Sequence, residues 1–230
     1  MKRLMPMIGC VLLLACSQQS WEQTLAEGEA AARNRRYAQA ERLFADAVSQ
    51  AEAFGLEDVR VARALTHLAE VYTAERKYAE AEPAYQRALR IYQAVHGEHH
   101  GDVAAVLNNL GVLHRMHGQY AEAEPLLKRA LAIKEVVYGP DHQEAAVTLA
   151  NLGQLYATQR KYVQAEPYFK RALAIREKTL GPDHPDVAKS LEEYAVLLRT
   201  VGREKEALPL ESRAQGIRIG LPSSPSRPRR

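Results

Sequence analysis

Nonpolar residues recur along much of this chain with the period of an α-helix. From Leu65 to Tyr72, nonpolar side chains stand at the first, fourth, fifth and eighth positions, and the same spacing returns from Leu149 to Tyr156. These positions share one face of a helix. After a short polar break a second nonpolar stripe follows the first, formed by Ala81, Tyr85, Ala88, Leu89 and Tyr92. The pattern therefore predicts pairs of amphipathic helices joined by tight turns.

This arrangement repeats along the chain. The segment 61–65, Val-Ala-Arg-Ala-Leu, has counterparts at 103–107, 145–149 and 187–191, and each begins 42 residues after the one before. A weaker first copy, one residue out of phase, precedes them. A single helix pair cannot cover its own apolar face, so such units are expected to stack on their neighbours. We expect about five stacked pairs.

Residues that end and begin helices stand at regular places in the repeats. Gly97, Gly139 and Gly181 suit a residue of left-handed conformation that closes a helix, because glycine has no side chain to clash there. Asp102 and Asp186 come just before the next apolar face, and their carboxylates are predicted to cap the free amides at a helix start.

The last unit differs from the others in its polarity. Glu211 and Gln215 stand where earlier copies have large apolar residues. A buried carboxylate would be costly, so we expect the helix Leu208–Ile219 to face water and to end the array. Residues 220–230 are rich in proline, serine and arginine, and they are predicted to form a disordered basic tail.

The first residues have the features of a signal peptide. Lys2-Arg3 precede an apolar stretch that ends at Ala15, and the chain becomes polar directly after Cys16. About 20 apolar residues are needed to span a bilayer, and this stretch is shorter. Residues 1–15 are therefore predicted to be a cleaved signal peptide.

The end of that segment, Leu13-Leu14-Ala15-Cys16, resembles the lipobox of bacterial lipoproteins. The resemblance implies that Cys16 is acylated and becomes the first residue of the mature chain, with 16–23 as anchor and short linker. Ser17 resembles the residue found in lipoproteins that are sent to the outer membrane. The alternatives are an ordinary secretory signal with a chain that carries no lipid, or an apolar starting segment in which the cysteine occurs by chance.

The repeated units resemble a known family. The pattern Leu-x-x-Leu-Gly/Ala-x-x-Tyr followed by Ala-x-x-x-Phe/Tyr is similar to the tetratricopeptide repeat, and the 42-residue spacing and Gly-Pro-Asp-His-Pro-Asp at 181–186 resemble the kinesin light chain type. The resemblance covers 24–219 and implies an all-α, right-handed superhelical solenoid of about five helix pairs. His114 departs from the pattern, since it replaces a tyrosine, and is expected to be a buried or half-buried ring.

The same resemblance implies a binding groove. In related solenoids that bind peptides, the first helix of each pair lines the concave side, and an asparagine there hydrogen-bonds the ligand backbone. Asn109 and Asn151 occupy that place here, with His67 and Glu193 in the flanking units. Their predicted neighbours are Arg63, Asn108, Arg115, Gln154 and Lys189. The alternative, that these asparagines only belong to the repeat consensus, stays open.

Charge argues against nucleic acid as a partner. The chain has 31 Lys and Arg against 28 Asp and Glu, a formal charge of +3, and loss of Lys2 and Arg3 would leave 29 against 28, or +1. Three of the remaining arginines lie in the tail. So small an excess gives no broad basic surface for phosphates.

The sequence gives no support for an enzyme or a cofactor. It lacks a glycine-rich phosphate loop, a Gly-x-Ser-x-Gly turn and a His-Glu-x-x-His helix. His96, His99 and His100 cluster in one loop, but a zinc site needs three or four convergent ligands. Because His142 and His184 recur in the equivalent turns, the loop histidines are interpreted as turn residues, and no metal is expected.

Together these features predict a non-catalytic scaffold, lipid-anchored to the bacterial cell envelope at the outer membrane and facing the periplasm. It would bind a protein or peptide in its groove and assist the assembly of an envelope complex. A non-lipidated exported adaptor or chaperone is the main alternative, and an enzyme that uses the histidine loop is a remote one. The sequence leaves the partner's identity and the oligomeric state open.

Overall fold

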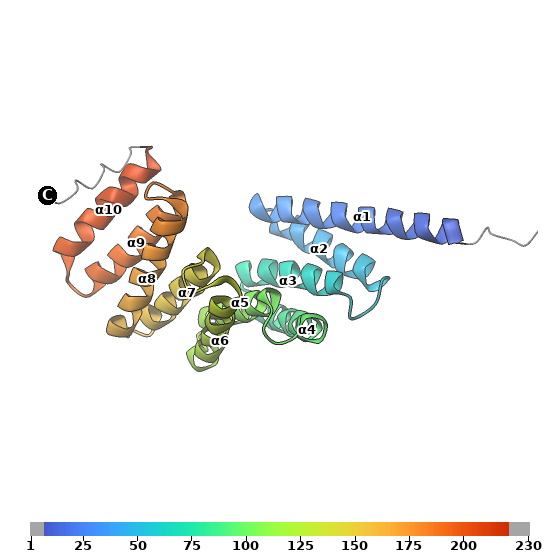
Figure 1. The fold of residues 1–230 in the computed structure, drawn as a ribbon, viewed down its shortest axis with the longest axis horizontal. Helices are drawn as coiled ribbons and strands as arrows, with labels where there is room; N and C mark the ends of the chain where they lie inside the picture. Colours follow the sequence, from blue (N-terminus) through green and yellow to red (C-terminus); the bar gives the residue numbers. More distant parts are fainter. Residues whose placement is uncertain (1–6, 221–230) are drawn as a thin grey trace, which may run out of the picture. The chain divides into compact units, whose positions relative to one another are not determined.

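The computed structural model of the chain describes the backbone of residues 7–220 and the side chains of residues 19–220. In this part the chain forms ten α-helices and no strand (Figure 1). They are α1 Met7–Arg33, α2 Tyr37–Glu52, α3 Val59–Ala74, α4 Tyr78–His96, α5 Gly101–Met116, α6 Tyr120–Tyr138, α7 Gln143–Thr158, α8 Tyr162–Leu180, α9 Pro185–Thr200 and α10 Glu204–Arg218. This confirms the predicted all-α fold and is consistent with about five helix pairs. None of the described helices is both long enough and apolar enough to span a bilayer.

The helices form two compact units, divided within α5. The N-terminal unit extends to Leu113 and the C-terminal unit begins at His114. In the first unit α1 packs on α2, α2 on α3, and α3 on α4; in the second, each helix from α6 to α10 packs on the next. Within each unit the principal contacts therefore join neighbours along the chain, as stacked helix pairs require.

Small residues let the helices of each pair approach closely. Ala81, Ala123, Ala165 and Ala207 occupy equivalent places in four second helices, and all four are fully buried. Larger side chains fill the space around them. In the C-terminal unit the main core cluster includes Leu127, Leu152, Phe169, Tyr194 and Leu198. The repeated alanines thus fix the spacing between backbones, and the larger residues exclude water.

The helix ends differ in two respects from the predictions. Gly97, Gly139 and Gly181 have φ values of 83°, 98° and 85°. Their ψ values, in the same order, are 170°, 154° and 159°, and these belong to an extended region. That region is not the left-handed helical one, although it too is open almost only to glycine. These glycines therefore turn the chain away from the helix axis into an extended loop.

Histidines, and not the predicted Asp102 and Asp186, cap α5 and α9, whereas α3 is capped by Asp58. The backbone amide of Asp186 donates to Nδ1 of His184 over 3.1 Å, and the amide of Asp102 donates to Nδ1 of His100 over 3.2 Å. His142 caps α7 in the same way. Asp102 and Asp186 lie one step further on, in the first turn, where a carboxylate interacts favourably with the helix dipole.

The N-terminal part of the fold begins earlier than predicted. Residues 16–23, expected as anchor and linker, belong to α1, and Trp21 is only 4% exposed. Trp21 and Leu25 are buried in the N-terminal unit, so the folded body includes residues before 24. The side chain of Cys16 lies outside the described residues, as do residues 1–6 of the predicted signal peptide and residues 221–230 of the predicted tail.

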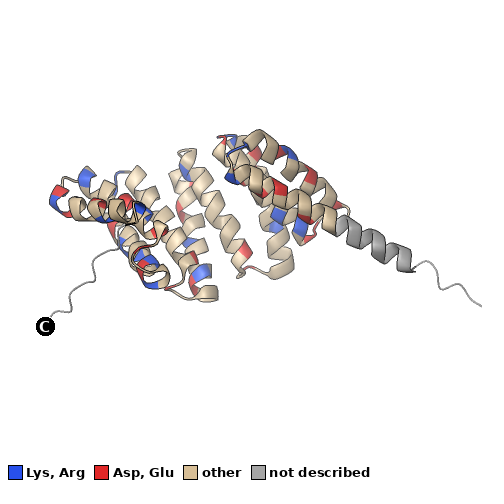
Figure 2. Cartoon of the chain, turned by 90° about the horizontal axis from the view of Figure 1, so that it is seen from above, with Lys and Arg blue, Asp and Glu red and all other residues tan. Residues whose placement is uncertain are grey.

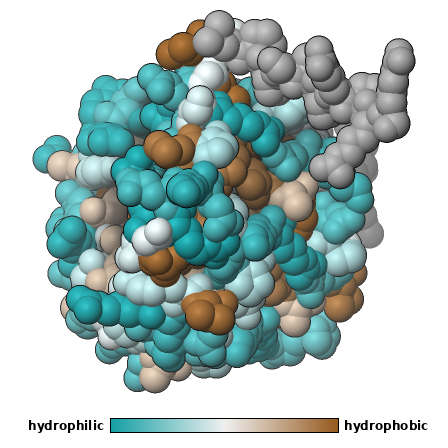
Figure 3. Space-filling view, turned by 90° about the vertical axis from the view of Figure 1, so that its left-hand side faces the viewer, coloured by the Kyte–Doolittle hydropathy of each residue, from teal (hydrophilic) through white to brown (hydrophobic). Residues whose placement is uncertain are grey.

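The last helix has the polar outer face that the sequence predicts, and it begins four residues before Leu208. Nη2 of Arg199 donates to Oε2 of Glu211 over 2.7 Å, and Gln215 is exposed. Figure 3 views this end of the chain and shows separate apolar side chains within a mainly hydrophilic surface. Positively and negatively charged residues are interspersed along the helices of both units (Figure 2).

The close approach of α7 to α8 generates a prediction. A Cβ added to Gly153 would lie 2.9 Å from Cε1 of Phe169, which is closer than carbon atoms pack. We therefore expect Gly153→Ala to destabilise the protein by about 1–3 kcal/mol. The measurement is urea unfolding followed by circular dichroism.

The control is the double variant Gly153→Ala, Phe169→Leu. The position equivalent to Phe169 in the preceding repeat is occupied by Leu127. The smaller leucine side chain should therefore relieve the clash and recover part of the lost stability. A single variant as stable as the wild type would contradict this account of the packing.

Candidate functional site

The C-terminal unit contains a groove of about 510 Å³. We call it the C-terminal groove. Most of its lining comes from the first helices α7 and α9, with smaller contributions from the end of α5 and from α8. The lining residues are Arg115, Gln154, Ala157, Thr158, Tyr162, Phe169, Glu192, Glu193, Val196, Leu197 and Thr200.

The lining of this groove combines apolar and polar side chains. Val196 is 63% exposed, and it lies beside Leu197 in the lining. Among the polar residues, Nε2 of Gln154 donates to Oε1 of Glu193 over 2.9 Å. The other oxygen of this carboxylate, Oε2, is buried and accepts no hydrogen bond within the described part of the chain. The groove thus offers both an apolar surface and an unsatisfied acceptor.

The N-terminal unit has a second groove, of about 750 Å³, with a different character. We call it the N-terminal groove. It is lined by residues of both charges, and the buried indole Nε1 of Trp21 has no hydrogen-bond partner in the described structure. Its lining consists of Trp21, Glu22, Asp58, Val59, Arg60, Arg63, Thr66, His67, Glu70, Tyr92, Asp102, Ala105, Val106 and Asn109.

Polar side chains connect the first helices across this groove. Nδ2 of Asn109 donates to Oε1 of Glu70 over 2.9 Å, and Oε2 of Glu70 lies 3.2 Å from Nδ1 of His67. Nε2 of His67 lies 3.5 Å from Oε1 of Glu29 on α1. Asn108 donates in turn to Oδ1 of Asn109 over 3.3 Å. Both polar atoms of Asn109 are therefore engaged within the protein.

The structure divides the predicted groove residues between the two units. Arg63 and Asn109 line the N-terminal groove, and Arg115 and Gln154 line the C-terminal groove. Asn108 is buried, whereas Asn151 is half-buried and Lys189 is exposed. Those three residues line neither groove. The asparagine position therefore behaves differently from one unit to the next.

The sequence prediction missed several lining residues. Trp21 was assigned to the linker, and Tyr92 to the core. Tyr92 is indeed buried, yet its ring also forms part of the N-terminal groove. The sequence indicates a polar and irregular first helix over Trp21–Arg33, and the apolar spacing from Trp21 to Leu25, one helical turn, is the signal for its buried side. His114 is buried, as predicted, and its Nδ1 lies 2.8 Å from Oε1 of Gln119.

An ion-pair cluster links three elements of the C-terminal unit. Glu166 of α8 lies 2.7 Å from Nζ of Lys170 and 2.7 Å from Nη1 of Arg203, and it accepts a hydrogen bond of 2.8 Å from the hydroxyl of Tyr194. These contacts, Lys170 foremost and then Arg203, lower the pKa of Glu166 to about 2. The carboxylate therefore fastens α8 to α9 and to the start of α10.

Comparison with known proteins identifies the family. The tetratricopeptide repeat family matches residues 60–135, 118–178 and 157–219, which together span more than half of the chain. The chain belongs to the tetratricopeptide repeat family. This confirms the resemblance that the repeated motifs indicate. Tetratricopeptide repeats are protein-binding modules, and the fold supports an interaction scaffold with protein partners.

Solved structures share this tetratricopeptide fold. BtubC (BKLC) from P. vanneervenii has a TM-score of 0.74 at 23% identity, over 94% of this chain and 93% of that one. A putative kinesin light chain repeat protein from Podosopora anserina has a TM-score of 0.69 at 22% identity, over 88% and 97%. A Rap protein complexed with competence and sporulation factor has a TM-score of 0.76 at 16% identity, over 86% of this chain and 54% of that one. A search of curated proteins found no match.

The Glu166 cluster predicts a pH-dependent stability. The pKa of Glu166 is lower in the folded chain than the ordinary value of 4.5, so its contribution is present at neutral pH and is lost as pH falls toward 2. We expect Glu166→Gln to cost about 1 kcal/mol at pH 7, since the cluster is partly solvent-exposed. The difference from the wild type should shrink steadily below pH 4.5.

Denaturant unfolding of both proteins at a series of pH values measures this difference. Glu211→Gln serves as the matched control, because it removes a carboxylate that pairs with an arginine in the same unit but lies outside the Glu166 cluster. A difference between Glu166→Gln and the wild type that stayed constant down to pH 2 would rule out the ionised cluster as its origin.

Proposed function

We propose that this tetratricopeptide protein is a non-catalytic scaffold that binds an extended segment of a partner protein in the C-terminal groove. The observation that carries the proposal is the combination of exposed Val196 with the buried, unsatisfied Oε2 of Glu193. A peptide segment would pack an apolar side chain against Val196 and would supply an N–H donor to Oε2 of Glu193.

The energetics favour this kind of ligand. Covering the exposed valine removes apolar surface from water, which contributes roughly 25 cal/mol per Å². A donor that reaches Glu193 would satisfy a buried charged oxygen, and hydrogen bonds to charged groups contribute about 1.5–3 kcal/mol. A backbone amide or a basic side chain of the partner meets this requirement. The Rap protein complexed with competence and sporulation factor shares the fold, which supports the use of such a scaffold for binding.

The polar groups of the two grooves differ in how far they are already bonded within the protein. The N-terminal groove is already bridged by the hydrogen bonds of Asn109 and Glu70, so a ligand there must compete with contacts within the protein. The C-terminal groove has an acceptor that nothing in the described chain satisfies. We therefore place the principal binding site in the C-terminal unit.

A pair of matched variants tests this assignment. Val196→Asp places a charge on the apolar part of the groove lining, whereas Val163→Asp makes the same change at a valine that is 89% exposed on α8 and outside the groove. The probe is a displayed library of random peptides, selected on the full wild-type chain. Selected peptides should bind Val196→Asp at least about tenfold more weakly, a loss of roughly 1.4 kcal/mol.

Fluorescence polarisation with the selected peptides measures the affinities, and circular dichroism shows whether both variants keep their helix content and melting temperature. Val163→Asp should bind as the wild type does. Equal losses in the two variants, or a library from which the wild type enriches no peptide, would refute the assignment.

We further propose that the scaffold is anchored to the bacterial envelope by lipid on Cys16 and assists the assembly of an envelope complex. The support is the order of features in the sequence: the basic residues, the short apolar stretch and Leu-Leu-Ala-Cys at 13–16. More than one acyl chain is needed for a stable anchor. A scaffold held there would bring its partner to the membrane surface.

Intact mass spectrometry of the chain purified from bacterial membranes tests the anchor. The expected product begins at Cys16 and carries acyl chains, and Cys16→Ser should abolish both the cleavage and the lipid. A product cleaved near this position but free of lipid would support the alternative of an exported adaptor or chaperone.

A further inference from the structure

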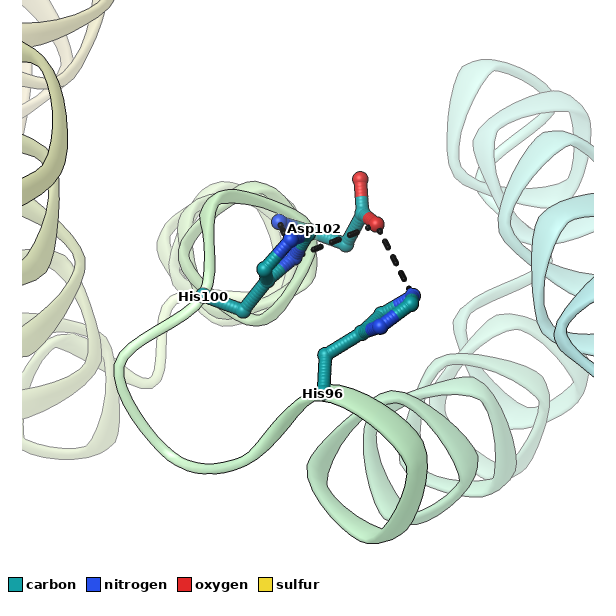
Figure 4. Close-up of side chains that lie close together, drawn as sticks. All are labelled: His96, His100 and Asp102. Carbon is teal, nitrogen blue, oxygen red and sulfur yellow. Dashed lines mark hydrogen bonds and ion pairs between the residues drawn. The ribbon is translucent and has the colours of Figure 1, made fainter.

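The loop between α4 and α5 brings together two imidazoles and a carboxylate. His96 ends α4, His100 caps α5, and Asp102 lies in the first turn of α5 (Figure 4). Oδ2 of Asp102 lies 3.6 Å from Nε2 of His96 and 3.3 Å from Nδ1 of His100. One potential ligand atom of each residue lies within 4.8 Å of the other two.

The repeat explains part of this arrangement, but not all of it. His100, His142 and His184 are equivalent caps, as the interpretation of the loop histidines as turn residues implies. His96 has no such explanation, because the equivalent positions hold Tyr138 and Leu180.

The fold itself holds a ring against the capping histidine. Tyr138 stacks on His142 with 5.0 Å between ring centroids, and His96 stacks on His100 with 4.2 Å. At the His96 position this chain therefore adds a second imidazole to a contact that the repeat already makes. Among the three equivalent loops of the described chain, this one alone combines two imidazoles with a carboxylate.

The distances suit a transition-metal ion. Zinc binds imidazole nitrogen and carboxylate oxygen at about 2.0–2.2 Å, so the ligand atoms of a tetrahedral site lie about 3.3–3.5 Å apart. The two separations that involve Asp102 are already close to this value. The three side chains are half-buried or exposed, so they can rotate into place and leave a fourth position open to solvent. Nitrogen ligands also favour zinc and similar transition-metal ions over magnesium or calcium.

We propose that His96, His100 and Asp102 form a binding site for a divalent transition-metal ion such as zinc. The ion takes the lone pair of Nδ1 of His100, which otherwise accepts the amide hydrogen bond from Asp102. Binding therefore replaces one helix-capping contact with metal ligation, and the carboxylate of Asp102 balances part of the ion's charge beside the positive end of the helix. The site thus ties the end of α4 to the start of α5.

Isothermal titration of the full chain with zinc chloride tests the proposal. The protein is purified without a histidine tag and stripped of metal with a chelator. We expect one zinc ion per chain. His96→Tyr introduces the residue found at Tyr138 and retains a ring to stack on His100, and it should weaken zinc binding at least about tenfold. His100→Asn, which keeps a side chain able to cap the helix, should do the same.

His99→Gln is the matched control, because His99 is exposed in the same loop but outside the three-residue cluster. Its affinity should equal that of the wild type. Melting temperatures measured in chelator should show that all three variants fold. No zinc binding by the wild type, undiminished binding by His96→Tyr, or an equal loss in His99→Gln would overturn the proposal.

A gain of binding provides an independent test. Leu180→His would place an imidazole near His184 and Asp186, the equivalents of His100 and Asp102. Nδ1 of His184 lies 3.7 Å from Oδ2 of Asp186, so the same geometry is within reach. The stoichiometry should rise from one zinc ion to two. A stoichiometry that stayed at one would contradict the geometric basis of the site.

Discussion

The structure depends on the burial of one apolar face of each helix pair against the next pair. No pair in either unit has enough apolar residues on both helices to enclose a core by itself, so stability comes from contacts between neighbours. The alanines at 81, 123, 165 and 207 allow this approach, and Gly153 allows an even closer one beside Phe169. At α10, the last helix of the described residues, the outer face carries Glu211 and Gln215 in place of apolar residues.

This constraint also explains where the functional surfaces lie. The packing faces are committed to the core, so the residues free to vary are those on the exposed sides of the first helices. In the C-terminal groove these positions hold Glu193 and the apolar Val196, and in the N-terminal groove they hold a network of charged and amide groups. The proposed metal site uses the loop positions instead, where the repeat requires only a cap and a glycine.

Much of the fold could be predicted from the sequence, because burial leaves a periodic record in it. The helical pairs, the polar end of the array and the buried ring of His114 all follow from which positions must be apolar. The helix caps were harder. An aspartate at a helix start is the usual signal, and Asp58 does cap α3, but α5 and α9 use a histidine nitrogen, with the aspartate two residues later.

The grooves were only partly predictable for a related reason. Arg63, Asn109, Arg115 and Gln154 line one groove or the other, whereas Asn108, Asn151 and Lys189 line neither. The role of these residues in binding a peptide stays a prediction. Membership in a groove depends on side-chain direction and on cross-helix bonds such as that of Asn109 with Glu70, and a repeat pattern encodes neither. Trp21 was missed because the first helix lacks the repeat's motifs, although its burial is nearly complete.

The burial of Trp21 restricts how far the folded body can be from whatever Cys16 carries. Only five peptide steps separate the two residues, and even a fully extended chain of that length reaches about 17 Å. The chain between Cys16 and Trp21 is therefore shorter than the thickness of a bilayer's apolar core, which is about 30 Å. Because Trp21 also lines the N-terminal groove, a lipid at Cys16 would hold this groove close to the lipid headgroups. The groove would then be within reach of proteins embedded in the same leaflet and out of reach of proteins on a distant surface.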